Sequence, residues 1–183
     1  MAGLYPLLRW FYLGWQDSLT ANPTEFLTRS SGTWTLVCLI VTLLVSPLRH
    51  WLGQPALIRL RRMCGLFAFF YASLHTLAWA WWEHDFVPVS MASDVIERPF
   101  VTVGVAALLL MLAMALTSNQ RAMRYLGSYW KALHRWVYLV AMLAIVHYWL
   151  HKAGKNDFSE VVIYGVVVAA LLAWRVWRWA RRA

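Results

Sequence analysis

Long apolar stretches alternate with short, cation-rich connections along this chain. With their flanks included, the stretches approach the length of about 20 residues that a helix needs to cross a membrane. We therefore predict an all-α, polytopic membrane bundle of about six transmembrane helices. No linker or repeat is evident, so residues 1–183 are expected to form a single domain. The apolar stretches are 4–15, 34–46, 65–82, 100–116, 136–150 and 161–174.

The ends of some predicted helices are less certain from the sequence, because several stretches are short and some contain proline. The stretch 4–15 contains Pro6 and Arg9, and it fits a truncated first helix, an interfacial helix or the remnant of a longer start. Pro47 and Pro99 are expected to mark helix limits, because proline lacks a backbone donor and disfavours helix at the residue before it. The amphipathic segment 121–135 is expected to lengthen the fifth span.

Lysine and arginine are distributed unevenly among the connections. Segments 49–62, 121–135 and 175–182 are rich in cations, whereas the alternate connections around 83–98 and 152–160 mix cations with acidic residues. Cytoplasmic loops of membrane proteins carry the excess of Lys and Arg. We therefore predict a multi-pass protein of the inner membrane with both termini in the cytoplasm.

The composition supports a membrane protein and excludes several other classes. Hydrophobic residues make up 61% of the chain, charged residues 14%, and the mean hydropathy is +0.53, which leaves too little polar surface for a soluble domain. The net charge of +9 follows membrane topology, so no nucleic-acid partner is expected. Cys38 and Cys64 form no C-x-x-C-H haem-attachment signature, and no nucleotide-binding fingerprint is present. If this chain has a redox function, its electrons would have to arrive from a membrane carrier or another subunit.

Histidines inside apolar stretches are the candidate chemistry. His75 lies in 65–82 with no other ionisable group, and His147 lies in 136–150. Ionisable side chains within a membrane are costly and commonly functional. Two helices that present imidazoles inward can hold haem. His134 precedes His147 by thirteen residues, about 19.5 Å along one helix but about 140° around it, so a second haem on the same helix would need a bend, a bulge or other partner helices.

Simpler interpretations stand beside these. A histidine in a membrane can hydrogen-bond across a helix interface without any cofactor. His134 could face lipid headgroups or cap a helix. His151 follows His147 by four residues, so this pair could ligate a metal ion, although a solvated loop residue fits as well. The cluster 59–62 is first a topology determinant and second a candidate for flavin phosphate or haem propionates.

Three segments resemble a known family over the range from about Asn22 to the C-terminus. They read PLRHWLGQPALIRLRRMCGLFAFFYASLHTLAW, ERPFVTVGV and LTSNQRAMRYLGSYWKALHRWVYLVAMLAIVHYWL. They are similar to the MsrQ/YedZ family, the haem-binding membrane subunits of the periplasmic methionine sulfoxide reductase system. That family belongs to the ferric reductase-like transmembrane superfamily.

The resemblance implies roles for three histidines. His75 matches the outer-haem ligand of the third helix, His147 its partner on the fifth helix, and His134 the inner ligand or a residue of the electron-accepting side. The expected third-helix partner of His134 falls fourteen residues before His75, at Arg61, and arginine does not ligate iron. An ordinary inner bis-histidine haem is therefore not implied. The short start at Met1 implies a clipped first helix.

The resemblance also implies an electron-transfer function. Members of the family take electrons from the quinone pool through b haem, with FMN as a second cofactor. They deliver the electrons to a periplasmic, molybdopterin-containing catalytic subunit that reduces methionine sulfoxide in oxidised proteins. The present chain would be the membrane subunit of such a heterodimer, and substrate reduction would occur on its partner.

Two other functions remain open from the sequence. A stand-alone transmembrane metal-ion reductase would use the same haem but would need a cytoplasmic flavin and nicotinamide domain, which this sequence lacks. A non-redox metal transporter could use His147 and His151 with the acidic connections. It would show no haem spectrum.

Overall fold

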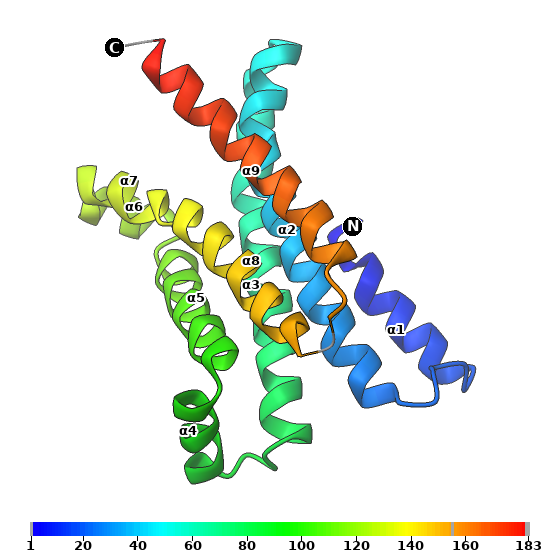
Figure 1. The fold of residues 1–183 in the computed structure, drawn as a ribbon. Helices are drawn as coiled ribbons and strands as arrows, with labels where there is room; N and C mark the ends of the chain where they lie inside the picture. The colour runs from blue at the N-terminus through cyan, green and yellow to red at the C-terminus, as the bar shows by residue number, and fades with distance from the viewer. Residues whose placement is uncertain (1, 155, 182–183) are drawn as a thin grey trace.

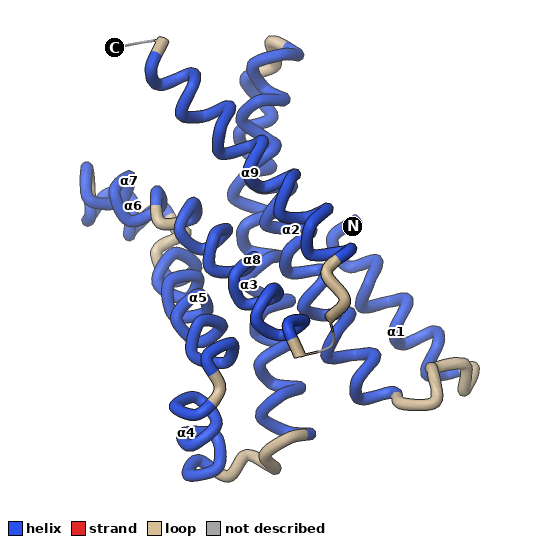
Figure 2. The backbone as a smooth tube through the Cα atoms, in the orientation of Figure 1, coloured by secondary structure: helices blue, strands red, loops and turns tan. Residues whose placement is uncertain are grey.

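The computed structural model describes residues 2–154 and 156–181, and all of its regular structure within these ranges is helical (Figures 1 and 2). The all-α prediction is confirmed. Predictions that concern Met1, Lys155 and Arg182 lie outside the described residues. The helices are α1 (Tyr5–Trp15), α2 (Pro23–Leu52), α3 (Ile58–Trp82), α4 (Pro88–Glu97), α5 (Pro99–Leu116), α6 (Gln120–Leu126), α7 (Ser128–Arg135), α8 (Val137–Ala153) and α9 (Ser159–Ala180), with short 3₁₀ turns at Ala2–Leu4 and Pro55–Leu57.

Within the described residues, five helical segments are long and apolar enough to cross a membrane, which confirms a polytopic bundle. They are Pro23–Leu52, Pro55–Trp82, Pro99–Leu116, Ser128–Ala153 and Ser159–Ala180.

Helix α1 is not one of these spans. Its 11 residues rise roughly 16 Å, about half of a hydrocarbon core of about 30 Å. Its start lies beside the middle of α3, where the Tyr71 hydroxyl donates to the Gly3 carbonyl at 2.6 Å. Further along, Trp10 Nε1 donates to Ser30 Oγ on α2 at 3.0 Å. In the structure this stretch is a short helix packed on α2 and α3 (Figure 1).

One of the two proline limits is wrong. Helix α2 continues through the buried Pro47 to Leu52 and ends at Gly53, whose φ of 63° suits glycine. A membrane helix tolerates an internal proline where neighbouring groups satisfy the freed carbonyl. Pro99 was placed correctly, because α5 begins there, at a position where a missing N–H costs nothing.

The segment 121–135 does not form one extension of the fifth span. Gly127, with φ 51° and ψ −118°, separates α6 from α7, and Trp136 separates α7 from α8. His134 therefore belongs to α7 and His147 to α8, which corrects the expectation that one regular helix carries both.

Two antiparallel hairpins form the centre of the bundle. Helix α2 packs along α3, and α5 packs along α8, while α3 also contacts α5 and α9 covers α8 and α2. The core at their junction is fully buried at Leu43, Ala68, Val140 and Ala141. Small residues such as these alanines let helix backbones approach closely, which is how membrane helices gain packing energy.

Charge divides the bundle into two ends. Segments 17–29, 83–98 and 152–160 carry all eight Asp and Glu residues and four of the 17 Lys and Arg residues. In Figure 1 the connections α1–α2, α3–α4 and α8–α9, which these segments contain, lie in the lower half of the picture. We call this the acidic end. The opposite, basic end is formed by segments 49–62, 121–135 and 175–181.

This division predicts the orientation. Because cation-rich connections stay inside, a fluorescent reporter fused after Arg124 should be active in the cytoplasm, and a periplasmic phosphatase reporter fused after Asp85 should be active outside. Measuring both reporters at both positions provides the internal control. Phosphatase activity after Arg124, together with cytoplasmic fluorescence after Asp85, would invert the orientation.

Candidate functional site

The structure brings His75 and His147 together between the two hairpins. His75 projects from α3 and His147 from α8, and their ring centres lie 6.1 Å apart with the ring planes at 89°. Both side chains lie in the half of their helix nearer the acidic end, seven residues before Trp82 and six before Ala153. The sequence prediction that these two histidines meet across helices is supported by this geometry.

Each imidazole is held by a backbone carbonyl of the other helix in its hairpin. His75 Nδ1 lies 2.8 Å from the Thr28 carbonyl oxygen, and His147 Nδ1 lies 2.7 Å from the Phe100 carbonyl oxygen. A carbonyl only accepts, so Nδ1 must carry the proton in both rings. The lone pair is then on Nε2 in both rings. A metal-ligating histidine commonly shows this arrangement, with its second nitrogen donating to a carbonyl.

Two glycines make room for these contacts. A Cβ added at Gly104 would lie 2.9 Å from His147 Nδ1, and one added at Gly32 would lie 3.2 Å from His75 Nδ1. Each glycine follows the accepting carbonyl by one helical turn. The imidazoles can therefore lie directly against the backbones of α2 and α5.

The two hairpins repeat the same constellation at one fixed spacing. Carbonyl, glycine and histidine recur 72 residues apart, from 28 to 100, from 32 to 104 and from 75 to 147. Without gaps, the same spacing also pairs other identical residues. They are Glu25 with Glu97, Ser46 with Ser118, and Arg49 with Arg121.

Sequence analysis missed this internal repeat, as well as the glycines and the two carbonyls. A comparison of the chain with itself at a 72-residue offset could have found the glycines, because they align when the histidines are superposed. The carbonyls belong to Thr28 and Phe100, whose side chains carry no matching signal.

The spacing of the two rings fits a single metal between them. A metal–nitrogen bond is about 2 Å and the ring centre lies about 1 Å further back, so two imidazoles on opposite sides of one metal have centres roughly 6 Å apart. The 6.1 Å between the ring centres matches this value. Neutral imidazoles are ordinary axial ligands of haem iron. The donor set and its spacing therefore suit a six-coordinate haem.

His134 lies away from this pair, toward the basic end. Its ring stacks on Trp130 with centres 3.9 Å apart, and its Nε2 lies 3.4 Å from Ser118 Oγ. The 72-residue repeat aligns His134 with Arg62 rather than with Arg61. Arg61 nevertheless interacts electrostatically with His134. The structure therefore places arginine around His134, and a second imidazole does not occupy the aligned position.

The His151 side chain lies beside the histidine pair, in contact with Phe100. Its ring centre lies 5.4 Å from that of Phe100, whose carbonyl holds His147 and whose own ring lies 6.0 Å from His147. His151 thus lies on the acidic side of the histidine pair.

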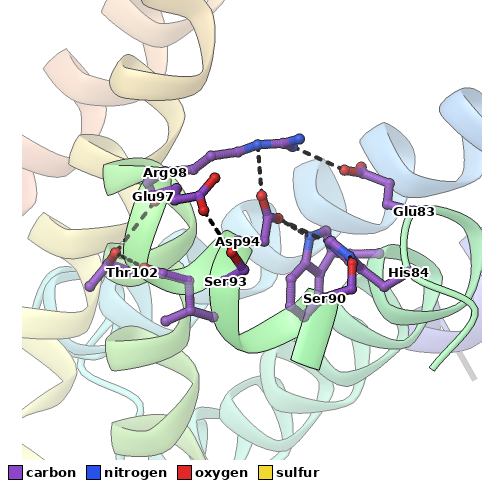
Figure 3. Close-up of polar contacts among 10 residues, drawn as sticks. Glu83, His84, Ser90, Ser93, Asp94, Glu97, Arg98 and Thr102 are labelled. Carbon is purple, nitrogen blue, oxygen red and sulfur yellow. Dashed lines mark hydrogen bonds and ion pairs between the residues drawn. The ribbon is translucent and has the colours of Figure 1, made fainter. Parts of the chain in front are cut away.

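A polar network at the acidic end fixes α4 against the end of α3 (Figure 3). Asp94 accepts from Trp79 Nε1 at 3.0 Å and His84 Nε2 at 3.1 Å, and it pairs with Arg98 Nε at 2.7 Å. Arg98 also pairs with Glu83 at 3.3 Å. Glu83, His84 and Asp94 lie close enough to hold a metal ion, but both carboxylates are already paired with Arg98. The network is better explained as a structural contact that holds α4 against the end of α3.

The α8–α9 connection contains a further ion pair at the same end. Lys152 Nζ lies 2.6 Å from Asp157 Oδ2, and Ser159 Oγ donates to Asp157 Oδ1 at 3.1 Å. The hydrogen bond from Lys152, with that from Ser159, holds the pKa of Asp157 below its usual range. Asp157 therefore stays ionised at neutral pH.

A cleft of about 1030 Å³ opens at the basic end between α2, α8 and α9. Arg175 crosses it, donating to Ser46 Oγ at 2.7 Å and to the Tyr138 hydroxyl. The lining also includes Arg49 and Arg178. Sequence analysis grouped these residues only as topology signals.

The bundle and its histidine pair define a ferric reductase-like transmembrane protein. The family described as "Ferric reductase like transmembrane component" matches residues 31–145, which run from within α2 to the middle of α8, just before His147. Three relatives of this chain are each named "Protein-methionine-sulfoxide reductase heme-binding subunit MsrQ". The relative from Bordetella pertussis is 65% identical over the whole chain and 88% of its own length, and that from Ralstonia nicotianae is 52% identical over the whole chain and 86%. The relative from Xanthomonas campestris is 41% identical over 91% of this chain and 79% of its own length.

The chain therefore belongs to the MsrQ family. The family prediction from sequence is confirmed. No solved structure matches the fold.

The glycines at the histidine pair generate a first test of the site. Gly104→Ala should displace the His147 ring, because the new Cβ would lie 2.9 Å from its Nδ1, and changes next to a metal ligand cost roughly 10- to 100-fold in metal affinity. Gly32→Ala should have a smaller effect of the same kind at His75. Haem content of the purified variants, measured by absorbance against protein concentration, reports the loss.

Gly154→Ala is the matched control, because nothing lies within 4 Å of a Cβ at that position. Full haem content in Gly104→Ala would show that the close contact does not position a ligand.

Proposed function

We propose that this protein is the membrane electron-transfer subunit of a methionine sulfoxide reductase system and that His75 and His147 hold its b haem. The observation that carries the proposal is the pair of neutral imidazoles 6.1 Å apart, each with Nδ1 on a backbone carbonyl. The names of the relatives support both the haem and the reductase system.

The chain's own residues would set the properties of the iron site. Bound haem supplies one-electron redox chemistry. Hydrogen bonds from Nδ1 to the Thr28 and Phe100 carbonyls orient the two rings and raise the basicity of each Nε2. His75 and His147 would both hold the haem iron through Nε2, and such a haem would supply electron transfer rather than binding of a small molecule. Reduction of a substrate therefore belongs on another subunit.

The position of the pair supports delivery of electrons at the acidic end. His75 and His147 lie in the half of the bundle nearer that end, which we expect to face the periplasm of the inner membrane. A molybdopterin-containing catalytic subunit would receive electrons there. The C-terminal end of α9 would lie in the cytoplasm. The N-terminus was expected there too, although α1 begins beside the middle of α3.

The basic end would receive electrons from the quinone pool. His134 lies there, stacked on Trp130 and near the charge of Arg61. FMN is proposed as a second cofactor on this side.

The first test of this function is removal of either ligand. His75→Ala and His147→Ala should each abolish or convert the low-spin b haem, because loss of one axial nitrogen changes both affinity and spin state. Reduced-minus-oxidised absorbance spectra of the purified variants measure this. His50→Ala, an exposed histidine at the basic end of α2, should keep the spectrum. Unchanged spectra in both ligand variants would refute the site, and absence of haem from the unmodified protein would favour a non-redox transporter.

A second test separates His134 from the haem. His134→Ala should leave the spectrum from His75 and His147 intact, because at roughly 19.5 Å along the helices it is too far to share their iron. It should slow quinol-driven reduction of that haem or lower flavin content, since the Trp130 stack and the Ser118 contact are lost. Stopped-flow haem reduction and flavin quantification provide the two readouts. Normal values in both would leave His134 as an interfacial histidine.

A further inference from the structure

The cleft at the basic end combines positive charge with an absence of protein counter-charge. Four arginines and His50 contribute to its lining, which contains no acidic side chain. All eight Asp and Glu residues lie in the segments of the acidic end. Among the described residues, Arg175 forms no ion pair with a carboxylate. The arginines of the lining are Arg49, Arg135, Arg175 and Arg178.

Arg175 is the cleft arginine whose charge is held by neutral hydrogen-bond partners rather than by a carboxylate. It is half-buried on a membrane-spanning helix, and its hydrogen bonds go only to neutral groups: the Tyr138 hydroxyl, Ser46 Oγ at 2.7 Å and the Leu43 carbonyl at 3.5 Å. Removing a charge from water is costly unless an opposite charge compensates it. Three bonds also leave two of the five guanidinium N–H groups for another acceptor.

The same contacts hold Arg175 in a fixed position. Its guanidinium lies 4.7 Å from the centre of the Tyr138 ring, and the bond to Ser46 ties α9 to α2. A planar, pre-positioned guanidinium is suited to a phosphate, because the N–H groups that remain on Nε and Nη1 can donate charge-assisted hydrogen bonds to its oxygens. Arg61 adds positive potential, because it interacts electrostatically with Arg175.

The other walls of the cleft are apolar and aromatic. They include Met142, Leu172, Trp174 and Trp179, and the guanidinium of Arg178 lies 5.2 Å from the centre of the Trp174 ring. The volume of about 1030 Å³ is near the upper end of small-molecule sites, which span roughly 300–1,000 Å³. Such a cleft has room for a phosphate group together with a large flat or apolar body.

We propose that this cleft binds a phosphate ester carried on an aromatic or apolar body, with Arg175 as the anchor of the phosphate. The phosphate supplies the negative charge that the lining residues lack. Two sources share this chemistry: the phosphomonoester of FMN and the phosphodiester of an anionic lipid. Tyr138 lines the cleft and precedes His147 by nine residues, roughly 13 Å along α8, so a flavin there would lie on the basic side of the histidine pair. The possibility that the ligand is FMN rests on the proposed function, whereas the phosphate site itself does not.

The experiment measures binding to the haem-loaded protein in detergent and in lipid nanodiscs. In detergent, FMN is titrated by flavin fluorescence, with riboflavin as the analogue that lacks phosphate. In nanodiscs of mixed phosphatidylglycerol and phosphatidylcholine, the lipid that remains bound after extraction is identified by native mass spectrometry. The haem spectrum of every sample is recorded, so that failure of the histidine site is seen separately from failure of the cleft.

Arg175→Gln should weaken binding of the phosphate ligand roughly tenfold or more, as expected for a lost charge-assisted hydrogen bond. Riboflavin binding should not change. Arg49→Gln, at the exposed rim of the cleft, should weaken phosphate binding less and provides a second variant if Arg175→Gln does not fold. Arg124→Gln is the matched control, because it is an exposed arginine of the same end that does not line the cleft.

The outcomes are distinct. FMN binding that depends on Arg175 and exceeds riboflavin binding supports the site with flavin as its source. Retained phosphatidylglycerol that depends on Arg175, without preferential FMN binding, supports the site with lipid as its source. The proposal is overturned if neither ligand depends on Arg175, or if Arg124→Gln weakens binding as much as Arg175→Gln.

Discussion

The interaction on which the site depends is the hydrogen bond from each imidazole to a carbonyl of the neighbouring helix. Hydrogen bonds between membrane helices average about 0.6 kcal/mol, so the two bonds, at 2.8 Å and 2.7 Å, add little to the stability of the bundle. Their effect is on chemistry, because they set the tautomer and the direction of both rings. Without them, either nitrogen of His75 or His147 could carry the proton, and the two Nε2 lone pairs would not be defined.

The repeat explains how one chain presents two such rings. Each hairpin contributes an accepting carbonyl, a glycine one turn later and a histidine 47 residues after the carbonyl. The hairpins diverge toward the basic end, where position 62 is arginine and position 134 is histidine. They also differ in regularity, since α3 is continuous from Ile58 to Trp82 while Trp136 interrupts the corresponding α7 and α8. The two hairpins are therefore alike toward the acidic end, where His75 and His147 pair, and differ toward the basic end, where arginine aligns with His134.

The sequence was sufficient for the class of fold, and it singled out the two histidines that the structure brings together, because hydropathy and isolated polar residues in lipid are strong local signals. It failed where the outcome depended on neighbouring helices. The buried Pro47 does not end α2, and the segment around Gly127 folds into two short helices. The carbonyl acceptors could not be predicted, since any residue can offer its carbonyl and only packing decides which one meets an imidazole. The role of Arg175 was hidden for a similar reason, because its partners Ser46 and Tyr138 come from two other helices.

Because His75 comes from one hairpin and His147 from the other, a metal between them would join the two halves of the bundle. The hairpins already meet through α3 and α5 and through the small residues of the core, among them Ala68 and Ala141. A ligand that needs both halves binds only the assembled bundle, and its binding free energy then adds to the stability of that assembly. The glycines contribute to the orientation, since they let each ring lie directly against the partner helix of its own hairpin. Each imidazole is thus oriented by contacts within its own hairpin, whereas binding of iron would require both hairpins to be packed together.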